Sequence, residues 1–97
     1  MRFEVRNRAQ IANKYIRFAK WKIRRLSARF GEVLYAELYV SKTGSRRKTF
    51  NVVVKMGVPG PDIIVKSEGS ELNKLWSGIS AKLKRQLRKQ GEKRYTR

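Results

Sequence analysis

Two stretches of this chain combine the apolar spacing of an amphipathic helix with a polar face that carries only positive charge. Residues 6–29 hold nine Lys and Arg side chains and no Asp or Glu, and residues 72–91 hold six and again no acid. Such helices must bury their apolar stripes in a common core while they hold unneutralised cations close together in solvent. Self-repulsion destabilises that arrangement in a lone protein, whereas the phosphates of a partner would neutralise it.

The apolar spacing predicts a first helix over residues 11–30. Its apolar residues recur at intervals of three and four, which gives one stripe along about five turns. Gly31 stands where a left-handed C-cap residue is expected. The stripe consists of Ala12, Ile16, Ala19, Ile23, Leu26 and Phe30.

A second helix is predicted near the end of the chain. Ser70 is a suitable N-cap, Glu71 suits the positive N-terminal end of the helix, and Gly91 is expected to end it. The apolar stripe consists of Leu72, Leu75, Trp76, Ile79, Leu83 and Leu87. Residues 92–97 are expected to form a basic C-terminal tail after a single domain that spans residues 1–91.

Alternation of polar and apolar residues predicts four short strands. The first places Phe3 and Val5 inward, and the others are expected over residues 32–41, 48–56 and 62–67. The predicted inward side chains of the second and third strands are Leu34, Ala36, Leu38, Val40, Phe50, Val52, Val54 and Met56. No crossover helix separates the last three strands, so they should form an antiparallel meander. The predicted fold is α+β in two layers, with the order β-α-β-β-β-α: a four-stranded, mostly antiparallel sheet with both helices on one face.

Composition fits one globular domain with an acidic partner. The 97 residues are 40% apolar and carry a net charge of +18, from 25 Lys and Arg against 7 Asp and Glu. Nucleic acid is the default partner of so basic a surface, and an anionic membrane surface is the rival. No apolar run is long enough for a membrane span or a signal-peptide core, which predicts a cytoplasmic protein without membrane association.

The sequence offers little for catalysis. Cys and His are absent, which excludes disulfides, thiolate chemistry and the usual zinc ligands. The acidic residues are scattered, and the segment Gly57-Val58-Pro59-Gly60 lacks the spacing and the following Lys-Ser/Thr of a phosphate-binding loop. We therefore expect a binding protein rather than an enzyme, with no metal, no cofactor and no small-molecule substrate.

The polar face of the first helix is the first candidate RNA-binding surface. Trp21 lies opposite the apolar stripe, and Lys14, Arg17, Arg24 and Arg25 surround it on a helical wheel. An aromatic ring among cations suits stacking on a base while the cations hold phosphates. The alternative is that Trp21 only packs against neighbouring Arg side chains. Phe18 is expected at the edge of the core.

Two further basic clusters are candidates for phosphate contact. The last helix lacks the i,i+4 Glu–Lys pairs of an ordinary solvated helix, which favours phosphate contact over simple solvation. Its candidate residues are Lys74, Lys82, Lys84, Arg85, Arg88 and Lys89. The tip of the hairpin loop at residues 42–47 adds Arg46 and Arg47, followed by Lys48. Tyr35 and Tyr39 are expected on the outer sheet face, where packing against Val53 is favoured over stacking on bases.

The end of the last helix resembles a known family. Lys82-Leu83-Lys84-Arg85-Gln86-Leu87-Arg88-Lys89 is similar to the basic "KLxRQLxK" ending of the ribosome hibernation-promoting factors, also called ribosome-associated inhibitors and formerly known as sigma-54 modulation proteins. The opening strand, the helix that contains Ile23-Arg24-Arg25-Leu26, and the order and spacing of the elements are also similar. Nearly the whole chain is covered, in the short form of the family.

The resemblance implies a protein that occupies the tRNA and mRNA channel of the small ribosomal subunit. There it would contact rRNA, block initiation and protect idle ribosomes, and it would be monomeric when free. By this analogy Lys82, Arg85, Arg88 and Lys89 line the rRNA contact. The helical wheel extends the contact to Arg17, Trp21, Arg24 and Arg25 of the first helix.

Two other RNA-binding classes remain open. A double-stranded RNA-binding domain contains the same helix–three strands–helix order. It usually offers a Gly-Pro-x-His loop and a Lys-rich start of the last helix, whereas this chain has Gly60-Pro61 without His and only Lys74 among residues 70–75. A structural ribosomal protein is the second alternative, although the long extended basic tails common in that class are missing here.

Overall fold

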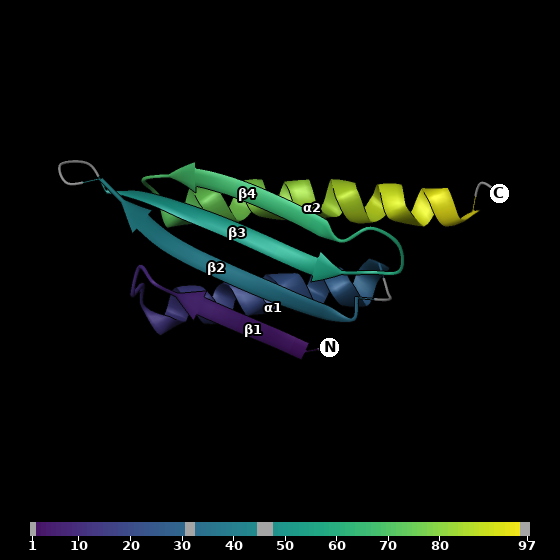
Figure 1. The fold of residues 1–97 in the computed structure, drawn as a ribbon, viewed down its shortest axis with the longest axis horizontal. Coiled ribbons are helices and arrows are strands. Elements are labelled where there is room, and N and C mark those ends of the chain that lie inside the picture. The colour runs from purple at the N-terminus through teal and green to yellow at the C-terminus, as the bar shows by residue number, and fades with distance from the viewer. Residues whose placement is uncertain (1, 31–32, 45–47, 96–97) are drawn as a thin grey trace.

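The computed structural model, which describes residues 2–30, 33–44 and 48–95, is a two-layered α+β fold (Figure 1). The order of the elements is the predicted one. They are β1 (Arg2–Asn7), α1 (Asn13–Phe30), β2 (Tyr35–Thr43), β3 (Thr49–Gly57), β4 (Ile63–Gly69) and α2 (Leu72–Tyr95). The molecule is elongated, with extents of 51 × 20 × 18 Å, and the C-terminal turns of α2 project beyond the end of the sheet (Figure 1).

The sheet has the order β1-β2-β3-β4 and mixed direction. β1 runs parallel to β2, with Arg2 opposite Tyr35 and Asn7 opposite Val40. The other two pairs are antiparallel, as expected for strands joined by short connections. The parallel pair requires a crossover, and α1 supplies it. The predicted fold class is therefore confirmed.

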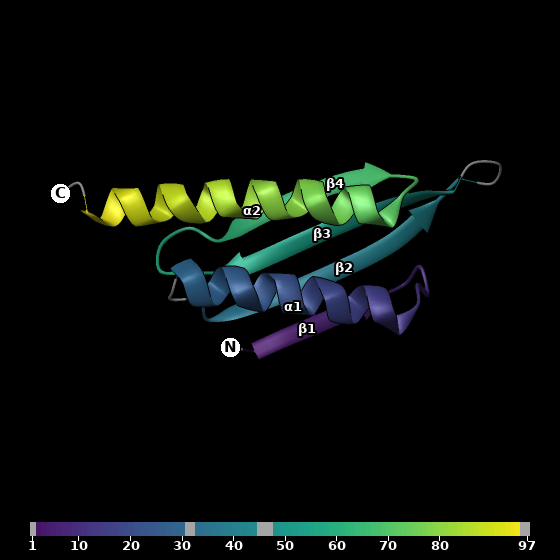
Figure 2. The ribbon, with the colours of Figure 1, turned by 180° about the vertical axis from the view of Figure 1, so that it is seen from behind.

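Both helices cover the same face of the sheet, and Figure 2 shows them side by side, running in the same direction. Their stripes meet the inward side chains of the strands in one core, where Leu38, Met56 and Leu83 are almost completely buried. The buried helical residues are Ile16, Ala19, Ile23, Leu75, Trp76, Ile79, Leu83 and Leu87, all of which belong to the predicted stripes. Phe3 and Val5 of β1 are partly buried against the same core, as predicted.

Three predictions about the beginnings of elements are wrong. Leu34 is 65% exposed, because β2 begins only at Tyr35 and the preceding Val33 packs against the core instead. Ala12 lies before the first turn of α1 and is exposed. The carbonyl of Glu71, not that of Ser70, accepts the first backbone hydrogen bond of α2, from the amide of Leu75 at 3.1 Å. Glu71 is thus the N-cap residue.

The predicted end of the last helix at Gly91 is also wrong, since α2 continues to Tyr95. Glycine permits a left-handed C-cap but does not impose one, and a helix tolerates it at a cost of about 1 kcal/mol relative to alanine. Among the described residues, positive φ angles occur at Gly44, Gly60 and Gln10. The expected C-cap Gly31 and the side chain of Phe30 lie outside the described parts of the chain.

One glycine of β3 is required by close packing. Gly57 lies directly opposite Tyr35 in the β2–β3 register, and the Tyr35 ring lies over it on the outer face of the sheet. A Cβ atom at position 57 would overlap the ring carbons of Tyr35. The glycine therefore provides the space into which the aromatic ring folds.

We expect Gly57→Ala to lower the free energy of unfolding by about 1–3 kcal/mol, because the added methyl group forces the Tyr35 ring to move. Gly78→Ala is the matched control, since a Cβ atom added there would meet no other atom within 4 Å and alanine favours the helix. That change should stabilise by about 0.5–1 kcal/mol. Urea denaturation measures both, and equal stability of the Gly57→Ala and wild-type proteins would refute the packing argument.

Candidate nucleic-acid interface

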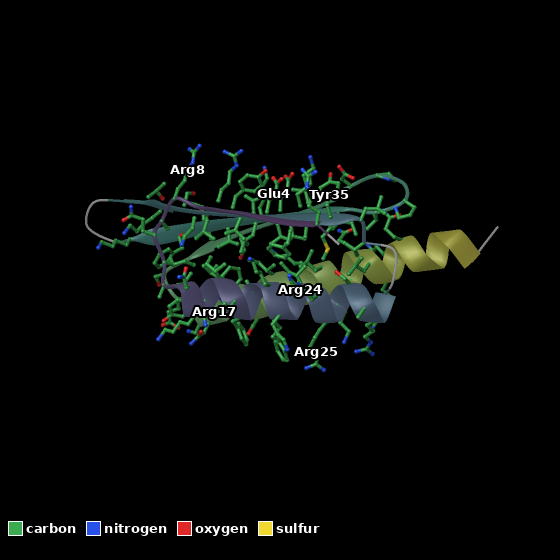
Figure 3. The ribbon with its side chains drawn as sticks, turned by 90° about the horizontal axis from the view of Figure 1, so that it is seen from below. Glu4, Arg8, Arg17, Arg24, Arg25 and Tyr35 are labelled. Carbon is green, nitrogen blue, oxygen red and sulfur yellow. The ribbon has the colours of Figure 1, made fainter. Side chains whose placement is uncertain are left out.

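Charge is divided between the two faces of the molecule. Figure 3 shows Glu4, Arg8 and Tyr35 on the outer side of the sheet, while Arg25 projects from α1 on the opposite side. Four of the acidic residues, Glu4, Glu37, Asp62 and Glu68, lie on or beside the outer sheet face, as the strand alternation requires. The helix layer is thus positive, and the sheet face carries charges of both signs.

Local hydrogen bonds set the start of α1. The side-chain amide of Asn7 donates to the carbonyl of Ile11 at 2.9 Å and accepts from the backbone amide of Ile11 at 3.0 Å. This closes the turn between β1 and α1, in which Gln10 has a φ of 55°. Because the apolar stripe of α1 packs into the core, its basic face points outward, and the predicted residues Lys14, Arg17, Trp21, Arg24 and Arg25 are all exposed.

An aromatic pair stands among the cations of α1. The ring centroids of Phe18 and Trp21 are 6.0 Å apart, and the guanidinium of Arg25 lies 4.8 Å from the Trp21 centroid. Phe18, which was expected at the core edge, is 42% exposed, with Trp21 and Lys22 beside it. Trp21 packs against Arg25, as the alternative to base stacking predicted, yet half of its surface remains exposed. An exposed face of that size suits base stacking.

A groove of about 520 Å³ separates the two helices on the side away from the sheet. Its α2 side consists of the small residues Ser80 and Ala81 and of Lys84, which is partly buried. Its α1 side consists of Trp21, Lys22, Arg25, Leu26 and Arg29. None of the described residues that line the groove is acidic, so the groove is an anion-attracting site.

The groove brings together predicted residues from two helices and adds others that the sequence did not reveal. Trp21, Arg25 and Lys84 were predicted, whereas Lys22, Arg29 and Ser80 were not. A wheel of each helix shows which side chains face away from its own stripe, but it does not show which side faces the other helix. The pair Ser80-Ala81 was the available signal, because small residues on an otherwise basic helix leave space beside it.

The other predicted cations of α2 point in several directions. Lys74 pairs with Glu71 at 3.4 Å, near the start of the helix. The ammonium group of Lys82 donates to the backbone carbonyl of Lys66 at 3.1 Å, so this side chain lies toward the β4 edge and away from α1. Arg85, Arg88 and Lys89 are exposed along the C-terminal half. Arg46 and Arg47 lie outside the described residues, and Lys48 beside them is exposed.

Polar side chains on the outer sheet face form hydrogen bonds with one another. The hydroxyl of Tyr39 donates to Glu37 at 2.6 Å, and that of Tyr35 donates to Asp62 at 3.0 Å. These hydrogen bonds, with desolvation and the carboxylate charges, raise the pKa of both phenols above the ordinary 10.0. The register places Tyr39 opposite Val53 as predicted, but Tyr35 opposite Gly57. Both rings are therefore engaged within the sheet.

We expect Glu37→Gln to lower the pKa of Tyr39, because the charged acceptor of its hydroxyl is lost. In the folded protein the raised pKa gives a stabilising contribution that is complete below the ordinary pKa of tyrosine and disappears as pH rises through the folded value. Ultraviolet absorption of tyrosinate during an alkaline titration measures the shift. Glu4→Gln is the control, since Glu4 is the smallest influence on Tyr39, and equal shifts in both variants would contradict the assignment.

The described part of the chain contains neither a membrane-spanning helix nor a cluster of metal ligands. Neither helix there is long and apolar enough to cross a membrane. No group of three or more acidic side chains among those residues could hold a metal ion.

Known proteins resemble this chain in fold rather than in sequence. No family model matches the sequence, and no curated protein matches it. Among solved structures, the Thermus thermophilus Protein Y N-terminal domain is similar with a TM-score of 0.71 and 20% identity, covering 91% of this chain and 93% of that one. A ribosomal subunit interface protein from Coxiella burnetii is similar with a TM-score of 0.77 and 18% identity, covering 92% and 96%. The fold that the family resemblance implied is thereby confirmed.

Proposed function

We propose that this protein binds the small ribosomal subunit and inhibits translation as a ribosome hibernation factor. The observation that carries the proposal is the basic helix layer, in which residues 13–30 of α1 and 72–91 of α2 contain no acid, on the fold of a ribosomal subunit interface protein. A partner with phosphates on several sides would neutralise both helices at once. The tRNA and mRNA channel, which is walled by rRNA, provides such surroundings in the cytoplasm.

Within this proposal, the contact surface is the helix layer. Arg17, Trp21, Arg24 and Arg25 contribute from α1, and Arg85, Arg88 and Lys89 contribute from α2, all of them exposed. The role is binding and steric occlusion, with no reaction catalysed. The net charge of +18 opposes self-association, so the free protein is a monomer.

The double-stranded RNA-binding alternative requires a different distribution of charge. Such domains insert the N-terminal end of the last helix into the RNA groove. In this protein that end carries Glu71 and the ion-paired Lys74, while Lys84, Arg85 and Arg88 lie in later turns. The helix face as a whole, rather than one helix tip, is the better candidate.

Sedimentation with purified ribosomal subunits tests the proposal at physiological salt. We expect saturable binding to the small subunit that tRNA displaces, because both would occupy one channel. A long RNA duplex without ribosomes serves as the comparison. Equal or tighter binding to the duplex would identify a double-stranded RNA-binding domain and refute the ribosomal assignment.

Charge reversal tests which face makes the contact. We expect Lys84→Glu with Arg88→Glu to weaken small-subunit binding at least tenfold, because two cations that face phosphates become anions. The control is Lys55→Glu with Lys66→Glu, which changes the net charge by the same amount on the outer sheet face. Melting curves confirm folding of both variants. Equal losses in the two variants would mean that net charge, rather than the helix face, determines binding.

A further inference from the structure

We propose that the groove between α1 and α2 binds a single unpaired nucleotide of RNA. The inference rests on the proposed function for its macromolecular partner and adds the class of ligand that this part of the surface accepts. It starts from the shape of the groove. Trp21 stands on one side and the small residues Ser80 and Ala81 on the other, which leaves a volume of about 520 Å³ open to solvent.

The α1 side of the groove suits a base. Trp21 is 50% exposed and lines the groove, so part of its indole can contact a ligand there. The guanidinium of Arg25, 4.8 Å from the indole centroid, holds the ring in place and can itself stack on a base. Phe18 lies beside the indole, with 6.0 Å between the ring centroids, and is not among the residues that line the groove. Leu26 adds a partly buried apolar surface to the groove.

The opposite side suits a sugar and a phosphate. Lys84 lines the groove from α2, and Lys22 and Arg25 line it from α1, so an anion there would lie near cationic side chains of both helices. The hydroxyl of Ser80 can donate to a phosphate or exchange hydrogen bonds with a ribose 2′-OH. With no acid among the described residues of its lining, the groove matches a nucleotide in both charge and apolar character.

The geometry selects an unpaired nucleotide rather than a duplex. In a helix of paired RNA the flat faces of the bases are covered by their stacked neighbours, and only edges and backbone are accessible. Trp21 forms one side of the groove, and half of its surface is exposed there and toward solvent. A base reaches its ring only when it leaves the stack, as in a loop, a bulge or a single strand.

Binding of short oligonucleotides tests the base contact directly. The probes are an unstructured oligouridylate, an oligomer of equal length and phosphate number with abasic sugars, and a duplex of equal phosphate number. We expect the oligouridylate to quench tryptophan fluorescence and to bind at least roughly fivefold more tightly than the abasic oligomer. Trp76 is only 3% exposed, so its emission provides an internal reference.

Variants assign the preference to the groove. Trp21→Ala should bind the oligouridylate and the abasic oligomer equally, and Ala81→Leu should do the same by filling the groove while it leaves Trp21 and every charge in place. Phe18→Ala is the matched control, because Phe18 is an exposed aromatic of α1 that does not line the groove. It should retain most of the preference.

Two results would overturn the inference. They are equal affinity of the wild-type protein for the oligouridylate and the abasic oligomer, and equal effects of Trp21→Ala and Phe18→Ala. Either result leaves the ribosomal proposal standing if the wild-type protein still sediments with the small subunit. Loss of that sedimentation, with the oligouridylate preference intact, would instead refute the ribosomal proposal alone.

Discussion

The whole structure depends on apolar contact that holds two positively charged helices beside each other. α1 and α2 run in the same direction, so their charges and their dipoles both repel. The opposing term is burial of one apolar stripe from each helix on one sheet face, where Ala36, Leu38 and Val54 are completely enclosed. The protein thus uses a shared core to concentrate charge that would otherwise spread apart.

The outer face of the sheet, unlike the helix layer, carries charges of both signs close together. Glu37 and Asp62 accept hydrogen bonds from tyrosines within that face, and Lys55 lies 3.8 Å from Asp62. Opposite charges there compensate one another locally, so the face has little net attraction for a polyanion. The long-range positive field therefore comes mainly from the helix layer.

The periodic parts of the sequence predicted most of the fold. Spacings of three and four identified the buried faces of both helices, and alternation identified Val52, Val54 and Met56 as core residues. The predictions that were wrong concern residues whose burial depends on tertiary contacts. Leu34 continued an alternating pattern beyond the point at which β2 begins, and Phe18, which was expected at the edge of the core, is exposed beside Trp21.

The candidate site was predictable in part for the same reason. Exposure of Trp21 and Arg25 followed from the wheel of one helix, and the basic ending of α2 followed from its composition. The groove needed the distance and rotation between two helices, which no local pattern contains. Lys22 and Ser80 entered the site only because the sheet fixes that geometry.

The parallel pairing of β1 with β2 has a consequence for the order in which the molecule folds. β2, β3 and β4 form local hairpins. β1 pairs with β2 only after the intervening α1, so Arg2 and Tyr35 are far apart in sequence. Loop closure over that distance is costlier and slower than hairpin formation. We expect the meander and α2 to assemble first and α1 to dock when β1 closes the sheet. A newly made chain would then complete its basic helix layer in its final folding step, although β1 and α1 are synthesised before the other elements described here.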